Sequence, residues 1–150
     1  MGTKYRGGAA EVRALDAYIK LMRAAASVSE RSNHHLHQYN LTPSQFGALE
    51  ALYHLSTLSQ VELARKLLLS SANITTVLQN LEKRDLITRR RDANDQRIVR
   101  VSLTETGTQL IEAILPSHVE GIAQEFGVLT AEEQDTLAAL CRKLGLQTSQ

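Results

Sequence analysis

The sequence predicts a mainly α-helical chain that carries one small antiparallel β-hairpin. Apolar residues recur every three or four positions over most of the 150 residues, which is the period of a helix facing a core. Helix-start signals recur along the chain, and only two prolines are present. Between residues 86 and 103, a charged run is followed by a segment in which apolar and polar residues alternate, a pattern typical of a β-hairpin.

The composition fits one domain with its own core, because 43% of the residues are hydrophobic and 22% are charged. The single cysteine, Cys141, excludes an intrachain disulfide and fits a reducing cytosol, so we expect a cytoplasmic protein. No apolar run approaches the roughly 18 residues of a membrane span, and residues 1–6 lack the apolar core of a signal peptide. No membrane partner is therefore expected.

The net charge of +1 conceals a local basic block. From Lys83 to Arg100 there are seven basic residues and three acidic ones, whereas Val101 to Cys141 contains seven acids and no Lys or Arg. Such a block on a nearly neutral chain indicates one surface that contacts a polyanion.

Residues 10–38 are expected to form one long helix with a single apolar stripe, because no Gly or Pro interrupts them. The stripe consists of Val12, Leu15, Ile19, Met22 and Ala26. A helix of this length exceeds the needs of a small core, so the stripe packs either on another subunit or on the chain's own core.

Three histidines near the end of this segment, His34, His35 and His37, are either a metal site or a solvated helix end. Only His34 and His37 share a helix face, and no Cys or carboxylate lies nearby at ligand spacing. We therefore predict no metal.

Two capped helices follow, and both begin with a capping box: Thr42-Pro43-Ser44-Gln45 and Ser59-Gln60-Val61-Glu62. The first helix is expected to extend to about Leu55 and the second to about Leu68. The residues expected to face inward are Phe46, Leu49, Leu52 or Tyr53, Val61, Ala64, and Leu67 or Leu68.

The next helix is expected over residues 70–84, with Ser70 as its N-cap. Its apolar residues, at i, i+3, i+4 and i+7, are Ile74, Val77, Leu78 and Leu81. The outward face is then Ser71, Asn73, Thr75, Thr76 and Gln79. Short hydrogen-bonding side chains at a helix N-terminus suit base edges and phosphates. A neutral surface helix is the alternative.

The short Leu69-Ser70 connection joins these two helices into a helix-turn-helix, with the second helix as the reader. Asp85 is expected to end that helix in the left-handed conformation, which Asp tolerates. Residues 86–90 and 98–103 then pair as antiparallel strands around the turn residues 92–95. A reading helix followed by a basic hairpin is typical of a winged helix that binds duplex DNA.

Arg97 lies just inside the hairpin tip, where its planar cation can enter a minor groove. Asp95 can orient it through a charge-assisted hydrogen bond. The alternative is that the pair only stabilises a surface turn.

Two helices complete the chain. The first begins at residues 104–107 and extends to about Phe126, and Pro116 inside it predicts a kink or a break. Its apolar stripe is Leu110, Ile111, Ile114, Leu115, Val119, Ile122 and Phe126. His118 lies on this stripe, so we expect a core or interface histidine rather than a metal ligand.

Thr130 begins the last helix with another capping box. This helix is expected to bury Leu137, Leu140, Cys141 and Leu144. Cys141 is then a small apolar core residue. The alternative, a redox switch, would need an exposed thiol with a lowered pKa, and the sequence shows neither.

From about residue 10 to 145, the chain resembles the MarR family of bacterial winged-helix regulators. The resemblance is carried by Leu81–Arg89 and by Asp95–Gly107, which contain the aspartate, arginine and Leu-Thr-x-x-Gly spacing of that family. The chain departs from the family pattern at Asp85, where Gly is common, and at the hairpin tip, where Pro is common before the Asp. These departures leave the pose of the wing open.

The resemblance implies one MarR-like domain over residues 1–150. It consists of a winged helix-turn-helix lobe (residues 41–104) and long dimerisation helices (residues 10–40 and 105–146), in an obligate homodimer. Family members usually respond to small phenolic or other aromatic ligands held between the dimerisation helices and the winged lobe. Some sense oxidants through a cysteine near the N-terminus or bind zinc. The zinc-binding members use His, Glu and Cys on their first and fifth helices. This chain has no cysteine near its N-terminus, and its fifth helix offers only His118.

We therefore expect a sequence-specific regulator that binds a double-stranded DNA operator as a homodimer, without cofactor or enzyme activity. It is expected to be a ligand-responsive repressor of a pseudopalindromic operator with half-sites roughly 34 Å apart. The expected DNA-binding residues are Ser70, Ser71, Asn73, Thr75, Thr76, Gln79, Lys83, Arg89, Arg90, Arg91, Asp95 and Arg97. The expected pocket for a small aromatic effector is Leu36, His37, Phe46, Leu49, Tyr53, Ile111 and Leu115.

Other functions remain as alternatives. One is a redox- or zinc-responsive regulator of the same fold, and another is a dimeric protein-interaction module that does not bind DNA. An enzyme is disfavoured, because the sequence has neither a Gly-x-Ser-x-Gly nucleophile elbow nor a Gly-rich phosphate loop.

Overall fold

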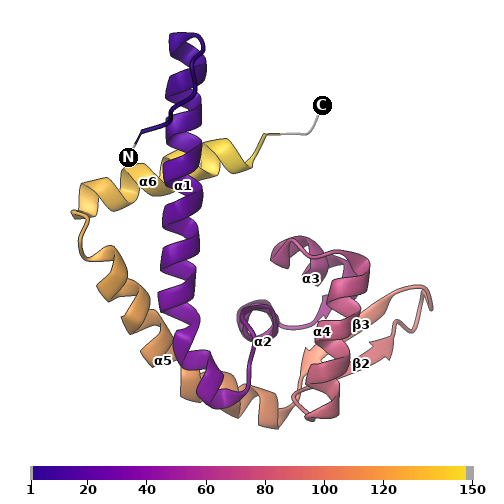
Figure 1. Cartoon of the computed structure of the whole chain (residues 1–150). Coiled ribbons are helices and arrows are strands. Elements are labelled where there is room, and N and C mark those ends of the chain that lie inside the picture. The colour runs from indigo at the N-terminus through magenta and orange to yellow at the C-terminus, as the bar shows by residue number, and fades with distance from the viewer. Residues whose placement is uncertain (1, 148–150) are drawn as a thin grey trace. The chain divides into compact units, whose positions relative to one another are not determined.

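The computed structural model describes residues 2–147 and divides the chain into two compact units (Figure 1). One unit, which we call the lobe, is formed by Asn33–Ser117. The other, the terminal unit, combines the residues up to Ser32 with those from His118 onward. Helix α5 (Glu105–Phe126) contributes to both. None of the helices in residues 2–147 has the length and apolar character that a membrane span requires.

The terminal unit is helical and contains α1 (Ala9–Asn33), the end of α5 and α6 (Ala131–Gly145). Helix α6 begins with the predicted capping box, in which the amide of Glu133 donates to Thr130 Oγ1 over 3.2 Å. Arg31 near the end of α1 forms an ion pair with Glu125 of α5, with 2.8 Å between Nη2 and Oε2. This pair joins two helices that are far apart in the sequence.

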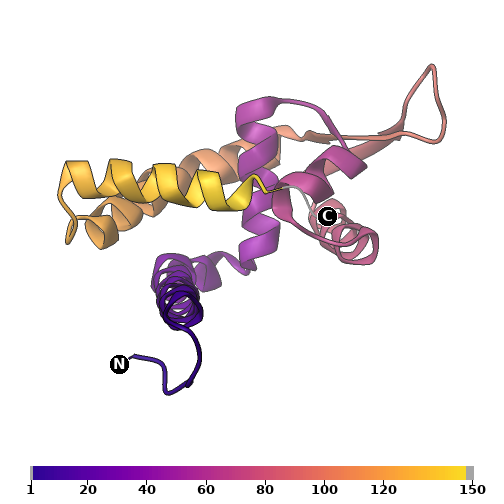
Figure 2. The ribbon, with the colours of Figure 1, turned by 90° about the horizontal axis from the view of Figure 1, so that it is seen from above.

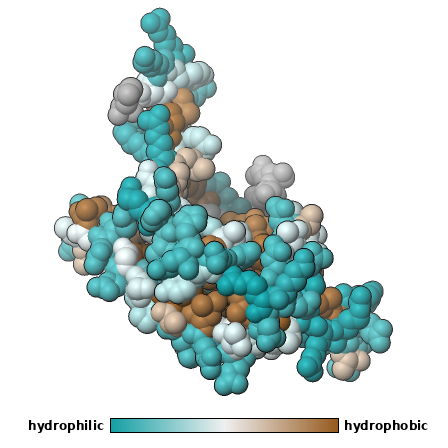
Figure 3. Space-filling model, turned by 60° about the horizontal axis from the view of Figure 1, so that its bottom comes forward, coloured by the Kyte–Doolittle hydropathy of each residue, from teal (hydrophilic) through white to brown (hydrophobic). Residues whose placement is uncertain are grey.

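The prediction that the last helix buries Leu140, Cys141 and Leu144 is wrong for the single chain. Leu140 is 60% exposed, Leu144 is 54% exposed, and Cys141 is also exposed. A helix face becomes buried only when another element covers it, and neither α1 nor α6 contains a buried residue. Figure 3 shows apolar side chains reaching the surface between hydrophilic ones.

The lobe contains a short 3-10 helix, three α-helices, a small sheet and the start of α5. These elements are η1 (His34–Tyr39), α2 (Pro43–Leu55), β1 (Leu58–Ser59), α3 (Gln60–Leu67), α4 (Ser71–Lys83), β2 (Ile87–Arg91) and β3 (Val99–Leu103). The sheet is antiparallel, with the order β1-β3-β2. The two hairpin strands lie within one residue of their predicted bounds. The strand β1 was not predicted, although it pairs Leu58 with Val101.

The long helix predicted over residues 10–38 is shorter in the structure. Its α-helical part ends at Asn33, and the chain tightens into the 3-10 helix η1. Within η1, Leu36 is buried in the lobe core, while His34 and His37 stay exposed. Asn40 then ends η1 with a φ of 53°, a left-handed conformation that Asn accepts more readily than most residues.

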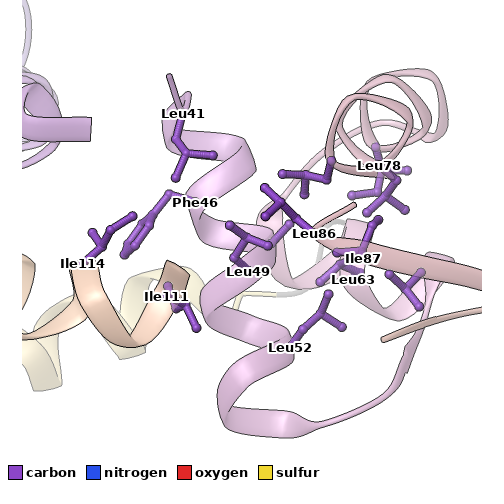
Figure 4. Packing of buried hydrophobic residues seen from close by; sticks show 14 of the residues in the cluster. Leu41, Phe46, Leu49, Leu52, Leu63, Leu78, Leu86, Ile87, Ile111 and Ile114 are labelled. Carbon is purple, nitrogen blue, oxygen red and sulfur yellow. The ribbon is translucent and has the colours of Figure 1, made fainter. Parts of the chain in front are cut away.

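The core of the lobe lies between α2, α4, the sheet and α5. Phe46 of α2 points toward Ile111 and Ile114 of α5, and Leu49 of α2 lies near Leu86 (Figure 4). Leu52 is buried whereas Tyr53 is 37% exposed, which decides between the two inward residues predicted for this helix.

The inward face predicted for α3 is partly wrong. Val61 is 60% exposed, whereas Leu63 is fully buried. Of the two alternatives predicted at the end of the helix, Leu67 packs partly buried against the core and Leu68 is 92% exposed. The cause is the capping box at Ser59, which places Leu58 and Leu63 at the two positions of a hydrophobic staple. In a helix of only eight residues this end effect outweighs the apolar period.

Helix α5 continues from Glu105 to Phe126. Of the two outcomes predicted at Pro116, a kink or a break, the break is therefore wrong. His118 is buried, with 6% of its surface exposed, as predicted for a core or interface histidine. At the start of the helix, Gly107 lies so close to the residue that precedes β2 that a Cβ atom would overlap the carbonyl oxygen of Leu86.

Candidate nucleic-acid interface

Helix α4 is fixed in the lobe by its apolar side. Ile74, Leu78 and Leu81 are at most 1% exposed, as their spacing predicted, and Val77 packs partly buried beside them. The hydroxyl of Ser70 accepts a hydrogen bond from the amide of Asn73 over 3.1 Å, which confirms the predicted N-cap. The remaining face of α4 is therefore held away from the core.

The outward face of α4 is polar, and four of its five predicted residues are exposed. These are Ser71, Asn73, Thr76 and Gln79. Thr75 differs because it is half-buried and its hydroxyl accepts from Gln60 Nε2 over 3.0 Å. The hydroxyls of Thr75 and Thr76 both donate to the backbone carbonyl four residues earlier, over 2.8 Å and 3.2 Å. Gln60 of α3 was not predicted to belong to this face.

The tip of the β2–β3 hairpin projects away from the helices of the lobe (Figures 1 and 2). There, Arg97 Nε and Nη2 donate to the two carboxylate oxygens of Asp95, each over 3.1 Å. The Arg97 side chain is nevertheless 91% exposed. Hydrogen bonding from Arg97 lowers the pKa of the Asp95 carboxyl, so the pair remains ionic. The predicted pairing of these two residues is confirmed.

Asp92 organises the turn that carries the Asp95–Arg97 pair. The sequence predicted a turn over residues 92–95 but did not indicate this role of Asp92. Its Oδ2 accepts from the amides of Asn94 and Asp95, each over 3.0 Å, and its Oδ1 accepts from Arg100 Nε over 3.0 Å. The bond from Arg100 is the largest cause of the lowered pKa of Asp92, followed by the two amides. The carboxylate thus fastens the tip to strand β3.

The basic residues of the lobe are not equivalent. Arg89 forms an ion pair with Glu82 of α4, with 3.1 Å between Nη2 and Oε1, and Arg91 Nη1 donates to the carbonyl of Gln96 over 2.7 Å. Lys83 and Arg90, in contrast, are exposed to solvent.

Arg84, which sequence reasoning counted only as part of the basic block, has a structural partner. Its guanidinium donates to the carbonyl oxygens of Asn40 and Tyr39. No local sequence signal marks this contact, because its partners are more than 40 residues away.

Four residues of the predicted ligand pocket belong to the core of the lobe: Leu36, Phe46, Leu49 and Ile111 are at most 2% exposed. Leu115 is partly buried, whereas His37 and Tyr53 are exposed. The hydroxyl of Tyr53 donates to Glu112 of α5 over 3.3 Å. A ligand at this place would have to separate side chains that are now in contact.

The His34 and His37 rings meet edge to face, with 5.6 Å between their centroids. Across residues 2–147, the structure places no three His, Cys, Asp or Glu side chains together as a metal site.

A capped polar helix beside a protruding basic hairpin is the DNA-binding unit of a winged helix-turn-helix regulator. The family model described as the MarR family matches residues 41–99. The HTH-type transcriptional regulator MhqR of Bacillus subtilis is 33% identical over 138 residues, which cover 92% of this chain and 95% of that protein. The chain belongs to the MarR family, and it is a DNA-binding transcriptional regulator rather than an enzyme.

Solved structures agree with this assignment. The S. aureus MepR–DNA complex has a TM-score of 0.75 at 28% identity, covering 85% of this chain and 94% of that one. BpsR of Bordetella bronchiseptica, whose DNA binding is regulated by 6-hydroxynicotinic acid, has a TM-score of 0.77 at 29% identity, covering 85% and 91%.

Proposed function

We propose that this chain is a ligand-responsive repressor that binds a pseudopalindromic operator as a homodimer. Helix α4 of each subunit would enter a major groove, and the tip of the β2–β3 hairpin would enter the flanking minor groove. The observation that carries this proposal is that the polar face of α4 and the Arg97 side chain both reach solvent from a lobe whose core is already closed. These groups are available for DNA without any loss of packing.

The homodimer is supported by apolar side chains that the terminal helices leave uncovered. Those at least half exposed on or beside α1, α5 and α6 are Tyr18, Met22, Val119, Val128, Leu140, Leu144 and Leu146. Burying such a surface against a second copy would contribute hydrophobic stabilisation that one chain lacks. Sedimentation equilibrium is expected to give twice the chain mass of 16.6 kDa. A monomer at micromolar concentration would contradict the proposal.

DNA binding is tested with genomic fragments in a gel shift at low salt, followed by a salt titration on the best fragment. Arg97→Ala is expected to weaken binding by about tenfold, since a groove contact is worth roughly 1–3 kcal/mol. Arg142→Ala removes an exposed arginine from α6 and serves as the matched control. Equal affinities of the Arg97 variant and the wild type would reject the wing contact. No bound fragment at low salt would favour a protein-interaction module instead.

The effector is proposed to be a small aromatic acid, since the DNA binding of the similar BpsR is regulated by 6-hydroxynicotinic acid. A thermal-shift screen of aromatic acids, thiol oxidants and zinc separates this proposal from its alternatives. A stabilising aromatic acid should also release the operator fragment. A response to oxidants or zinc alone would favour a redox- or zinc-sensing regulator.

A further inference from the structure

A hollow of about 450 Å³ lies between α3 and α4 of the lobe. Its residues come from one side of α3 along its length, from the connection that follows and from the first turns of α4. They are Gln60, Val61, Ala64, Arg65, Leu68, Leu69, Ser71, Ile74 and Thr75. Ser71 and Thr75 also belong to the polar face of α4, so the hollow is continuous with the proposed reading surface.

Two apolar side chains of this hollow are unusually open to solvent. Val61 is 60% exposed and Leu68 is 92% exposed, although most leucines of the lobe are buried or partly buried. Leu68 also ends α3 with a φ of 54°, a conformation in which a bulky residue is strained and which Gly or Asn adopts at lower cost. Neither the core nor the backbone therefore favours leucine at position 68.

We propose that Leu68 and Val61 form the apolar wall of a recess for the C5-methyl group of a thymine in the operator half-site. The inference rests on the proposed placement of α4 in a major groove, where that methyl group is the one apolar feature that a base edge presents. The hollow is larger than a methyl group, which leaves room for the neighbouring sugar.

The polar members of the hollow fit the rest of a nucleotide. The exposed Arg65 brings a cation to the rim, where it suits a phosphate oxygen. The amide of Gln60 is held by Thr75 over 3.0 Å, which fixes one side of the opening. An apolar wall with a cationic rim is complementary to the methylated edge of a thymine beside its own backbone.

The test replaces each thymine of the half-site in turn by deoxyuridine, which lacks only the methyl group, and measures operator affinity. For the wild type, one position is expected to lose about fourfold in affinity per half-site, the effect of burying one methyl group. For Leu68→Asn the loss caused by that same replacement should be much smaller, because only Val61 remains of the apolar wall. Asn accepts the left-handed backbone, so this variant should melt at or above the wild-type temperature.

The matched control is Leu55→Asn, which removes another exposed leucine of the lobe outside the hollow and should keep the wild-type deoxyuridine profile. If every thymine tolerates deoxyuridine in the wild type, or if Leu68→Asn keeps the sensitivity, the recess is overturned. If Leu68→Asn instead abolishes binding of a small aromatic acid, the hollow is a ligand site and the recess is again overturned. If the wild type binds no fragment at low salt, it is the proposed function that fails.

Discussion

Arg84, at the C-terminal end of α4, donates a hydrogen bond of 2.8 Å from Nη1 to the carbonyl oxygen of Asn40. Its Nη2 donates to the neighbouring carbonyl of Tyr39 over 3.0 Å. A single planar cation thus joins the end of α4 to the turn that precedes α2. The orientation of α4 therefore depends on the place where η1 ends.

Replacing Arg84 by Ala is expected to lower the free energy of unfolding by about 1 kcal/mol, because two charge-assisted hydrogen bonds at a solvent-exposed site are lost. Urea denaturation measures the change. Lys83→Ala, at the neighbouring exposed position, should stay within about 0.5 kcal/mol of the wild type. Equal midpoints for the two variants would show that the Arg84 contacts do not stabilise the lobe.

Replacing Gly107 by Ala is expected to destabilise the protein by about 2–3 kcal/mol, because the new Cβ atom would overlap the backbone oxygen of Leu86 and α5 would have to shift. Gly121→Ala in the same helix meets nothing within 4 Å and should stabilise by about 0.5–1 kcal/mol. Thermal unfolding of the two variants gives the comparison. The reverse order of melting temperatures would contradict the close approach of α5 to Leu86.

The Asp92 carboxylate predicts a pH effect. Its pKa is lowered in the folded state, mainly by the hydrogen bond from Arg100, so its contribution to stability is present above its unfolded pKa. That contribution is lost as the pH falls through about 4 toward the lower folded pKa. The stability difference between the wild type and Asp92→Asn should therefore be largest above pH 4 and shrink below it.

Urea denaturation between about pH 3 and 6 measures this difference, a range that spans the ordinary pKa of an aspartate. Asp135→Asn on the exposed surface of α6 controls for the removal of one negative charge. A difference that stays constant across this range would show that the Asp92 bonds do not depend on its charge.

Asp95→Asn separates orientation from charge at the hairpin tip. Removing a negative charge close to DNA alone would strengthen binding. If Asp95 instead holds Arg97 in the pose that the groove requires, the specific operator should bind about threefold to tenfold more weakly, as expected for a weakened groove contact. Fluorescence anisotropy on the operator and on a scrambled duplex measures both effects.

Asp85→Asn is the control for that experiment, since it removes an acid at the base of the hairpin, away from the tip, at a φ of 57° that Asn accepts. It should leave operator binding unchanged or slightly tighter. If Asp95→Asn behaves in the same way, the pair serves only the turn.

Features set by neighbouring residues were predictable from the sequence. The capping boxes at Thr42, Ser59 and Thr130 fixed three helix starts, because hydroxyl and amide lie within one turn of each other. The left-handed conformation of Asp85 was also predictable, because a helix end often needs it and Asp tolerates it. Strand β1 was missed because it has two residues and exists only through pairing with β3, some 40 positions later.

The sequence predicted which types of residue form the candidate interface, but it predicted fewer of the hydrogen-bond and ion-pair partners of those residues. The bond between Asp95 and Arg97 spans two positions and could be predicted. The pairing of Arg89 with Glu82 depends on how α4 packs on β2, which no local pattern encodes. The apolar pattern predicted Leu67 or Leu68 as inward and could not show that the left-handed turn exposes Leu68.

The residues with positive φ have a thermodynamic consequence. Asn40, Ser56, Leu68 and Asp85 each end or follow a helix of the lobe, and none of the four is a glycine. A left-handed conformation costs an ordinary residue about 1–2 kcal/mol more than it costs glycine. Asn and Asp accept this conformation more readily, so the cost falls on Ser56 and Leu68, and we expect the lobe to be less stable than it would be with glycine or asparagine at these two positions. Engineering it for heat resistance should begin at these joints and leave the core unchanged.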